Sequence, residues 1–395
     1  MASIFFNYPH ITGKESDYIN EVLAERHLCG DGKFSRLCHQ WLEETLGCPK
    51  ALLTPSGTAA LEMAALLLDI GPEDEVIMPS FTFVSTANAF VLRGAKVVFV
   101  DINPETLCIE PSEIEKAIGK KTRAVVPVHY GGIGCEMHAI TRICRDASIS
   151  IVEDAAHAIQ SKYDRKPLGT FGSLSAFSFH ETKNLVAGEA GALIINDETL
   201  IERAEIIREK GTDRSRFFRG QIDKYTWQDI GSSYLPSELQ AAFLWAQIEH
   251  SDFILSRRQW AWQNYHSLLE PLEKAGLLRR PVVPEYAMQN GHLYYILLPD
   301  RQTRDELMAF LHSRDIGAVF HYIPLHDSPA GKRYGRSVGQ LSVTSDVSGR
   351  LLRLPLSVSL TIEQIEFVAA SVGEFFKVNK IEQPRKPLFD SAKSS

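Results

Sequence analysis

Between residues 50 and 210, short apolar runs alternate with amphipathic segments, and this alternation constrains the fold more than any other feature of the sequence. The apolar runs are capped by Pro, Gly or Asp, as in "DEVIMPS", "KVVFVDI" and "SISIVEDAA", and a further run is "RAVVPVHY". The segments between them read as helices, as in "GTAALEMAALLLDIG". Strands and helices that alternate in this way are typical of βαβ units on a mainly parallel sheet. Because helices cover both faces of such a sheet, its strands are apolar throughout, and we predict an α/β protein.

The remainder of the chain predicts a second, smaller α/β unit. Residues 234–272 read as one long helix that leads into this unit. Its expected elements are strands near 291–299 and 318–324 and helices at 303–313 and 362–377. We predict a large domain at 1–250, a small C-terminal domain at 251–378 and a disordered tail at 379–395, since the tail is polar and lacks periodicity.

Composition excludes several classes of protein. No apolar run approaches the length of about 20 residues that spans a bilayer, and the first residues lack the basic region and cleavage site of a signal peptide, so we expect a cytoplasmic protein. The six cysteines all precede residue 150 and form no CxxC pair, which indicates free thiols in a reducing compartment. A net charge of −7 without a long basic tract argues against nucleic acid as a partner.

Three features carry the chemistry. In "TPSGTAAL", Ser56, Gly57 and Thr58 stand between a strand and the first turn of a helix, where backbone N–H groups favour an anion such as phosphate; an ordinary helix cap is the alternative. Asp154 ends the apolar run "SISIV" and is either functional or a capping or ion-paired residue. Lys183 follows "SAFSF" and precedes a glycine-rich stretch, although a single lysine is more often a solvated surface residue.

A phosphate cradle, an aspartate and a lysine are together what pyridoxal phosphate requires. The lysine binds the aldehyde of the cofactor covalently and moves protons, the aspartate keeps the pyridine nitrogen protonated, and the helix N-terminus takes the phosphate. We therefore expect pyridoxal 5'-phosphate as the cofactor.

Other classes of function remain open at this point. A metal-dependent hydrolase would use Asp154 and His157 with His129 or His180, but no established ligand motif is present and we predict no metal site. A nucleotide-binding dehydrogenase is less consistent with the sequence, since "GGIGCE" lacks the third glycine of the dinucleotide-binding fingerprint and follows the wrong strand. A non-catalytic sensor that binds the cofactor also remains possible.

The stretches "SGTAAL", "MPSFTFVSTANA", "VEDAAHA" and "FSFHETKN", in this order and spacing, resemble the DegT/DnrJ/StrS family of nucleotide-sugar aminotransferases. The resemblance extends over roughly residues 5 to 377. It implies the aspartate-aminotransferase fold, known as fold type I, with a large cofactor-binding domain and a smaller C-terminal one. A sugar dehydratase of this family replaces the lysine by histidine, so Lys183 favours transamination.

The resemblance also implies roles for individual residues. Lys183 would be the covalent lysine, and Asp154 the partner of the pyridine nitrogen. Phe83, whose alternative is ordinary core, would stack on the cofactor ring. The residues implied to hold the phosphate are Ser56, Gly57, Thr58 and Ser178. The chain departs from many members at His157, where they have Gln beside the phenolic oxygen of the ring, and at Ser233, where they have an Asn that reaches the cofactor of a neighbouring subunit.

The substrates follow from the resemblance alone. It implies transfer of an amino group from L-glutamate to C-4 of a TDP-linked 4-keto-6-deoxy sugar, with the galacto product as the expectation and the gluco epimer or a 3-keto sugar as alternatives. It also implies a homodimer. Candidate substrate-side residues are His129, His180, Tyr322 and His326, together with Arg214, Arg216, Arg219 and Lys224 of the loop "GTDRSRFFRGQIDKY", which suit a diphosphate or an ordinary solvated surface.

Overall fold

A mixed eight-stranded sheet forms the centre of the protein. The computed structural model describes residues 3–378, so the tail predicted at 379–395 lies outside the described residues. The strand order is β1-β9-β8-β5-β4-β2-β3-β13, and within it β9 alone runs antiparallel to its neighbours. The mainly parallel sheet is thus confirmed. The strands are β1 (Lys50–Thr54), β2 (Glu75–Pro79), β3 (Lys96–Val100), β4 (Thr122–Val125), β5 (Ser150–Asp154), β8 (Leu174–Ser178), β9 (Gly191–Ile195) and β13 (Gly335–Ser337).

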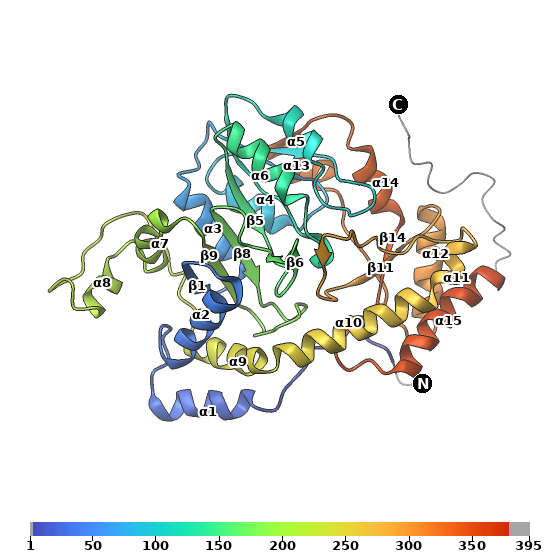
Figure 1. Ribbon diagram of the computed structural model, residues 1–395, viewed down its shortest axis with the longest axis horizontal. Coiled ribbons are helices and arrows are strands. Elements are labelled where there is room, and N and C mark those ends of the chain that lie inside the picture. Colours follow the sequence, from blue (N-terminus) through green and yellow to red (C-terminus); the bar gives the residue numbers. More distant parts are fainter. Residues whose placement is uncertain (1–2, 379–395) are drawn as a thin grey trace.

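Helices cover both faces of this sheet (Figure 1). Alternate residues of each strand face opposite cores, so that Leu53 and Ile77 join one cluster while Leu52 and Val76 join the other. The first cluster is covered by α2 (Lys33–Leu46), α5 (Pro111–Ala117), α6 (Met137–Asp146) and α9 (Glu238–Glu249), with α1 (Glu15–Glu25) outside α9. The second is covered by α3 (Gly57–Leu67), α4 (Val84–Val91) and α7 (Ile201–Arg208).

The long helix predicted over 234–272 is wrong in its extent. The structure has two main helices there, α9 and α10 (Ser251–Leu268), followed by the short α11 (Glu270–Lys274). Helix α9 begins only after Ser237, whose hydroxyl accepts from Gln240 N in a capping box. His250, at φ −105° and ψ 10°, breaks the helical path between α9 and α10. Both helices are apolar on their inner sides, which is why periodicity alone did not reveal the break.

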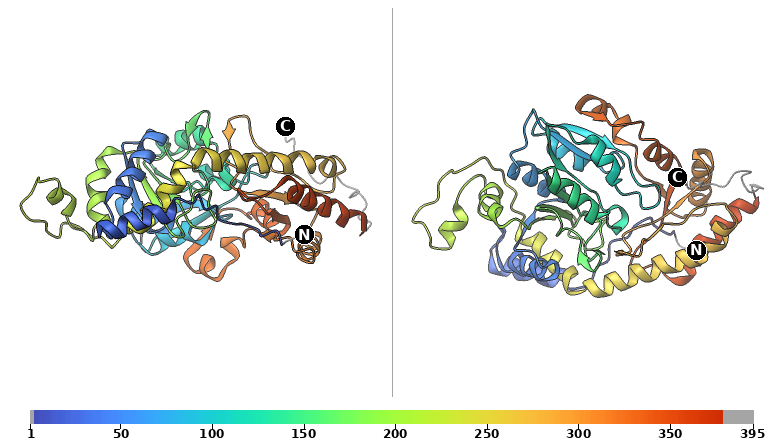
Figure 2. Two further views of the ribbon diagram at one scale, coloured as in Figure 1. Left: turned by 90° about the horizontal axis from the view of Figure 1, so that it is seen from below. Right: turned by 45° about the horizontal axis from the view of Figure 1, so that its top comes forward.

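A second unit is built around the C-terminal part of α10 and has its own hydrophobic core (Figure 2). The predicted strands and helices are confirmed there as β11 (Tyr294–Leu297), β12 (Val319–Phe320), α12 (Arg301–His312) and α15 (Ile362–Val378). The strand β14 (Leu351–Leu354) lies between β11 and β12. The division at residue 250 stays a prediction.

The N-terminal segment joins the second unit. Ile4 forms a parallel bridge with Ile316 and is buried in the same core as α10, α12 and α15. Two residues further on, Phe6 accepts a backbone hydrogen bond from Leu356, and the Asn7 side chain donates to the carbonyl of Glu181. The first residues of the chain therefore connect the second unit to the loop after β8.

The remaining elements are short. The connection between α7 and α9 carries α8 (Arg214–Phe218) and stands away from the body of the molecule (Figures 1 and 2). The others are β6 (Lys162–Tyr163), β7 (Lys166–Pro167), β10 (Ala287–Met288), α13 (Pro329–Tyr334), α14 (Ser342–Arg350) and the 3-10 turns η1 (Tyr130–Gly132), η2 (Glu198–Leu200) and η3 (Leu325–Asp327). Within residues 3–378, no helix is both long and apolar enough to cross a membrane. The six cysteines form no disulfide.

Candidate active site

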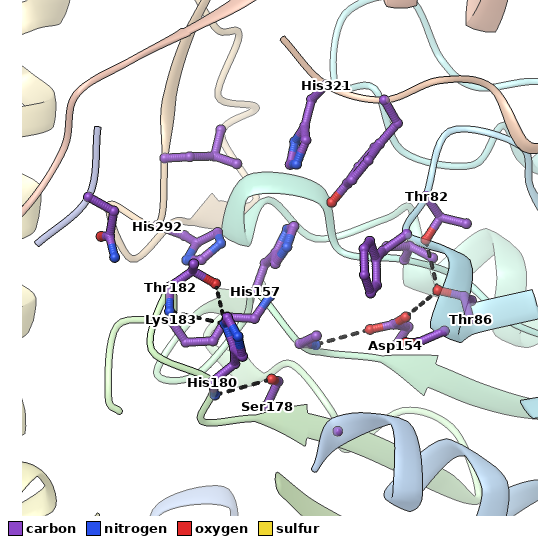
Figure 3. A pocket seen from close by; sticks show the side chains of 18 of the residues that line it. Thr82, Thr86, Asp154, His157, Ser178, His180, Thr182, Lys183, His292 and His321 are labelled. Carbon is purple, nitrogen blue, oxygen red and sulfur yellow. Dashed lines mark hydrogen bonds between the residues drawn. The ribbon is translucent and has the colours of Figure 1, made fainter. Parts of the chain in front are cut away.

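A cavity of about 450 Å³ lies where the carboxyl ends of β5 and β8 meet the first turns of α3 and α4. Figure 3 shows the side chains of many of the residues that line it. Residues of the N-terminal segment, β14 and the region around β12 close the opposite wall. Ligands of parallel sheets collect at the carboxyl ends of the strands, so this cavity is the candidate active site.

One end of the cavity has the features of a phosphate site. Ser56 caps α3 through its hydroxyl, which accepts from Ala59 N at 3.1 Å, and Thr58 Oγ1 lies 2.7 Å from Ser85 Oγ. A Cβ on Gly57 would lie 2.9 Å from Ser178 Cβ, so only glycine lets the start of α3 approach β8 this closely. The first N–H groups of α3 and these hydroxyls converge on one side of the cavity, which suits a phosphate dianion.

Asp154 ends β5 and faces the cavity with its hydrogen-bonding capacity partly used. Its Oδ2 accepts from Thr86 Oγ1 at 2.7 Å, and its Oδ1 accepts from Ala156 N at 3.1 Å. Thr86 Oγ1 in turn lies 2.8 Å from the hydroxyl of Thr82. These contacts fix the orientation of a carboxylate that is only 6% exposed and leave it able to hold a cationic ring nitrogen.

Lys183 reaches the cavity from the loop after β8. Its backbone N–H donates to His180 O at 2.8 Å, which fixes the start of the side chain. Burial lowers the pKa of Lys183 to about 8; Asp154 opposes this shift and Arg353 adds to it. The amine is therefore far more often neutral, and so nucleophilic, near pH 7 than an ordinary lysine.

His157 and His292 stack on each other beside Lys183, with ring centroids 4.2 Å apart and planes inclined by 28° (Figure 3). Burial lowers the pKa of both imidazoles well below the usual range, and the charge of Lys183 lowers it further. Both rings are thus neutral, so His157 carries no charge at the position where many family members have an uncharged Gln.

Three other predicted residues also line the cavity. Phe83 is 58% exposed at the start of α4, so the alternative of ordinary core is wrong for it. Tyr322 stacks on His321 at 3.5 Å, and burial raises the pKa of its hydroxyl. His180 Nδ1 accepts from Thr182 N at 3.2 Å. The roles assigned to these residues stay predictions.

The prediction that His129 is a substrate-side residue is wrong for this cavity. His129 is completely buried, and its Nε2 donates to the equally buried Glu153 at 2.9 Å. Its Nδ1 accepts from Cys135 N, so both ring nitrogens are engaged. Val128 lines the cavity instead, because successive residues of an extended chain point to opposite sides.

Six more predicted residues do not line the cavity of their own chain. His326 Nδ1 lies 2.7 Å from Ser80 Oγ, and Ser233 bridges Glu209 at the exposed edge of the α7–α9 connection. Arg214 and Lys224 lie on that same connection, with Arg214 Nη1 3.5 Å from Glu209 Oε2. Arg216 and Arg219 pair with Glu202 and Glu205. A contact of these residues with a ligand of the same chain is therefore not supported.

Sequence reasoning did not find Thr86, His292 or Arg353. Thr86 lies in "FVSTANA", where its spacing of three from Phe83 indicates the same helix face, and this signal was available. His292 and Arg353 come from the second unit, more than 100 residues from Lys183, and no local pattern places them at the cavity. Arg353 also has its guanidinium over the ring of Phe6 at 4.5 Å.

The residues at the cavity fit pyridoxal phosphate. The narrow start of α3 suits the phosphate, the oriented carboxylate of Asp154 suits the protonated ring nitrogen, and the amine of Lys183 suits the aldehyde. The predicted lysine, aspartate and phosphate-binding residues thus lie together, although their individual roles stay predictions.

Comparisons with known proteins identify the class. The model of the DegT/DnrJ/EryC1/StrS aminotransferase family matches residues 9–373. GDP-perosamine synthase of Escherichia coli O157:H7 is 32% identical over 372 residues, which cover 93% of this chain and 97% of that protein. The spore coat polysaccharide biosynthesis protein SpsC of Bacillus subtilis is 31% identical over 380 residues, covering 94% and 97%. The structure of Helicobacter pylori PseC, an aminotransferase involved in the biosynthesis of pseudoaminic acid, has a TM-score of 0.86 and 27% identity, covering 95% of this chain and 100% of that one.

The fold and the cavity define an aminotransferase of the α/β class. The chain belongs to the DegT/DnrJ/EryC1/StrS family of aminotransferases, whose chemistry depends on pyridoxal phosphate. The predictions of family, fold, enzyme class and cofactor are confirmed, and the hydrolase and dehydrogenase alternatives are wrong.

Proposed function

We propose that the protein transfers the amino group of L-glutamate to C-4 of TDP-4-keto-6-deoxy-D-glucose, giving TDP-4-amino-4,6-dideoxy-D-galactose and 2-oxoglutarate. The observation that carries the reaction type is the partly neutral Lys183 amine in one cavity with Asp154 and the phosphate cradle. The names of the relatives, a GDP-perosamine synthase and a polysaccharide biosynthesis protein, support a sugar acceptor. The TDP group, the C-4 position and the galacto product rest on the sequence resemblance, as does a place in enterobacterial common antigen synthesis.

Different residues at the cavity would have different roles in the reaction. Pyridoxal phosphate, when bound, supplies an electron sink that acidifies the Cα–H bond of the amino donor. Asp154 would hold the ring nitrogen protonated, and Ser56, Thr58 and Ser178 with the N–H groups of α3 would hold the phosphate. Lys183 Nζ would take the proton from Cα of glutamate and later deliver one to C-4 of the sugar. A pKa of about 8 suits both steps, because the amine gains and loses a proton easily near neutral pH.

We also propose a homodimer, with the connection between α7 and α9 as part of the contact. This connection projects from the body of the chain and exposes large apolar side chains, with Phe218 66% and Trp227 81% exposed. Such a cluster on a projecting segment favours burial against another protein surface. Sedimentation equilibrium of the active enzyme tests this, and a fully active monomer would contradict it. The cytoplasmic location stays a proposal.

The decisive experiment is product analysis. The purified protein is incubated with L-glutamate and TDP-4-keto-6-deoxy-D-glucose; 2-oxoglutarate is measured enzymatically, and the sugar product by NMR. We expect equal amounts of 2-oxoglutarate and of a sugar aminated at C-4, whose ring coupling constants show an axial amino group. An equatorial amino group would show the gluco epimer. Reaction only with a 3-keto isomer would place the amination at C-3 instead of C-4. Absence of 2-oxoglutarate with every nucleotide-linked keto sugar would refute the proposed acceptor class.

A further inference from the structure

The stacked imidazoles of His157 and His292 have opposite tautomers. Gly131 N donates to His157 Nδ1 at 3.3 Å. A backbone N–H can only donate, so Nδ1 of this neutral ring carries the lone pair and Nε2 carries the proton. His157 therefore offers a donor at Nε2, the nitrogen that remains available to the cavity.

The tautomer of His292 follows from its contact with Asn184. His292 Nδ1 lies 2.9 Å from Asn184 Oδ1, while Asn184 Nδ2 donates to the carbonyl of Asn290 at 2.9 Å. The amide is thus oriented with its oxygen towards His292, and an amide oxygen only accepts. The proton of His292 is on Nδ1, and its Nε2 carries the lone pair.

The backbone around the two rings is tied together. Asn290 Nδ2 donates to the carbonyls of His157 and Ile159 at 2.9 and 2.8 Å, and Asn290 Oδ1 accepts from His292 N at 3.0 Å. One buried side chain therefore fixes the spacing between the two imidazoles. In the part of the chain that the structure describes, no hydrogen bond is made to Nε2 of either ring.

Burial and nearby cationic groups both disfavour a proton on the stacked rings. Burial is the largest cause that lowers the pKa of both imidazoles, and Lys183 and Arg353 lower it further, with Arg258 adding to the effect at His292. A proton on either ring would face these groups and its stacked neighbour at 4.2 Å. The stack therefore excludes an imidazolium at position 157, where the ring would otherwise titrate near neutral pH.

We propose that His292 is a positioning residue, which holds His157 as a neutral Nε2–H donor towards the phenolic oxygen of the bound cofactor. The amide N–H of Gln, which many relatives have at this position, is a donor that does not titrate. His292 makes the imidazole of His157 an equivalent donor, because it stacks against this ring and excludes the charged form of the imidazole. This inference rests on the cofactor of the family and not on the identity of the sugar.

The tautomer of His157 can be measured directly. Side-chain ¹⁵N chemical shifts of histidine are recorded in the cofactor-free wild-type protein between pH 6 and 8, with H157Q to assign the signals. We expect His157 to be protonated at Nε2 alone over this range. A predominant Nδ1–H form, or titration of His157 between pH 6 and 8, would overturn the proposal without any substitution at position 292.

Affinity for pyridoxal phosphate tests whether His292 acts through His157. Dissociation constants are measured by equilibrium dialysis for the wild type, H292L, H292F, H157L and H157L/H292L. Loss of the stack in H292L is expected to weaken binding about three- to tenfold, while H292F keeps an uncharged ring and should stay within about twofold of the wild type. The exposed H138L serves as a matched control and should bind as the wild type does.

The double variant decides the outcome. If His292 acts through His157, H292L should have no further effect on cofactor affinity in the H157L background. An equal loss in both backgrounds would show that His292 contacts the cofactor itself or only supports the fold, and would overturn the proposal. Should H292L fail to fold, H292Q replaces it in the cycle. These readouts are independent of sugar turnover, so a wrong acceptor would leave them unchanged.

Discussion

Replacement of Lys183 by Met is expected to stabilise the cofactor-free protein. Burial lowers the pKa of this lysine from 10.5 to about 8, so at pH 7 the folded protein must hold a charged amine in an environment that disfavours it. The difference between these two pKa values corresponds to about 3 kcal/mol, which is an upper value because water in the cavity relaxes part of the penalty. The catalytic amine thus lowers the free energy of unfolding.

The pH dependence gives this prediction a definite sign. The penalty is fully present below the folded pKa of about 8 and disappears as the pH rises towards the unfolded value of 10.5. Urea unfolding of cofactor-free wild type and K183M should therefore show K183M more stable by up to about 3 kcal/mol at pH 7 and by roughly half of that at pH 9.5. The exposed K120M should show no such difference. A K183M that is less stable than the wild type at pH 7, or a gain independent of pH, would refute the reasoning.

Four further substitutions test the surroundings of the cavity. Thr86→Val removes the hydroxyl that donates to Asp154 and should weaken cofactor affinity about tenfold in equilibrium dialysis; unchanged affinity would contradict the role of this contact. Glu153→Gln removes a buried charge that accepts from three backbone N–H groups, and we expect the free energy of unfolding, measured in urea, to fall by about 3 kcal/mol. A fall of less than about 1 kcal/mol would contradict this. Gly191→Ala would place a Cβ 2.4 Å from the backbone at the start of α3, so both the cofactor affinity and the melting temperature should fall. An unchanged cofactor affinity or an unchanged melting temperature would be evidence against this close approach. Arg353→Gln should raise KM for L-glutamate about tenfold and leave KM for the sugar nearly unchanged. The reason is that the guanidinium of Arg353 lines the cavity without an acidic partner among the described residues and therefore suits a carboxylate. A raised KM for the sugar alone would assign Arg353 to sugar binding.

The sequence predicted the parts of the site that lie next to a local signal. Asp154 and Lys183 each follow a recognisable apolar strand, and Ser56 stands at a strand-to-helix junction, so their positions follow from the rule for parallel sheets. His129 was misplaced because the sequence does not show which way the chain turns after β4, and a shift by one residue reverses the direction of a side chain.

The residues of the second unit could not be predicted in the same way. Arg353 and His292 reach the cavity only because the second unit packs against the large sheet, and that contact depends on tertiary structure rather than on any periodicity. The tautomers of His157 and His292 likewise depend on Gly131 and Asn184, which are distant from them in sequence. Local patterns thus identified the chemistry, whereas the electrostatic environment required the whole fold.

The bridge between Ile4 and Ile316 affects the order in which parts of the enzyme fold during synthesis. At about 5 to 20 residues per second, the ribosome adds Ile316 roughly 15 to 60 s after Ile4. During that interval the large sheet can fold while the first residues still lack their partner strand. Phe6, which lines the cavity, accepts a backbone hydrogen bond from Leu356 and lacks this partner until the second unit has formed. We therefore expect a nascent chain that stops before the second unit to hold the cofactor poorly, even with Lys183 and Asp154 already in place.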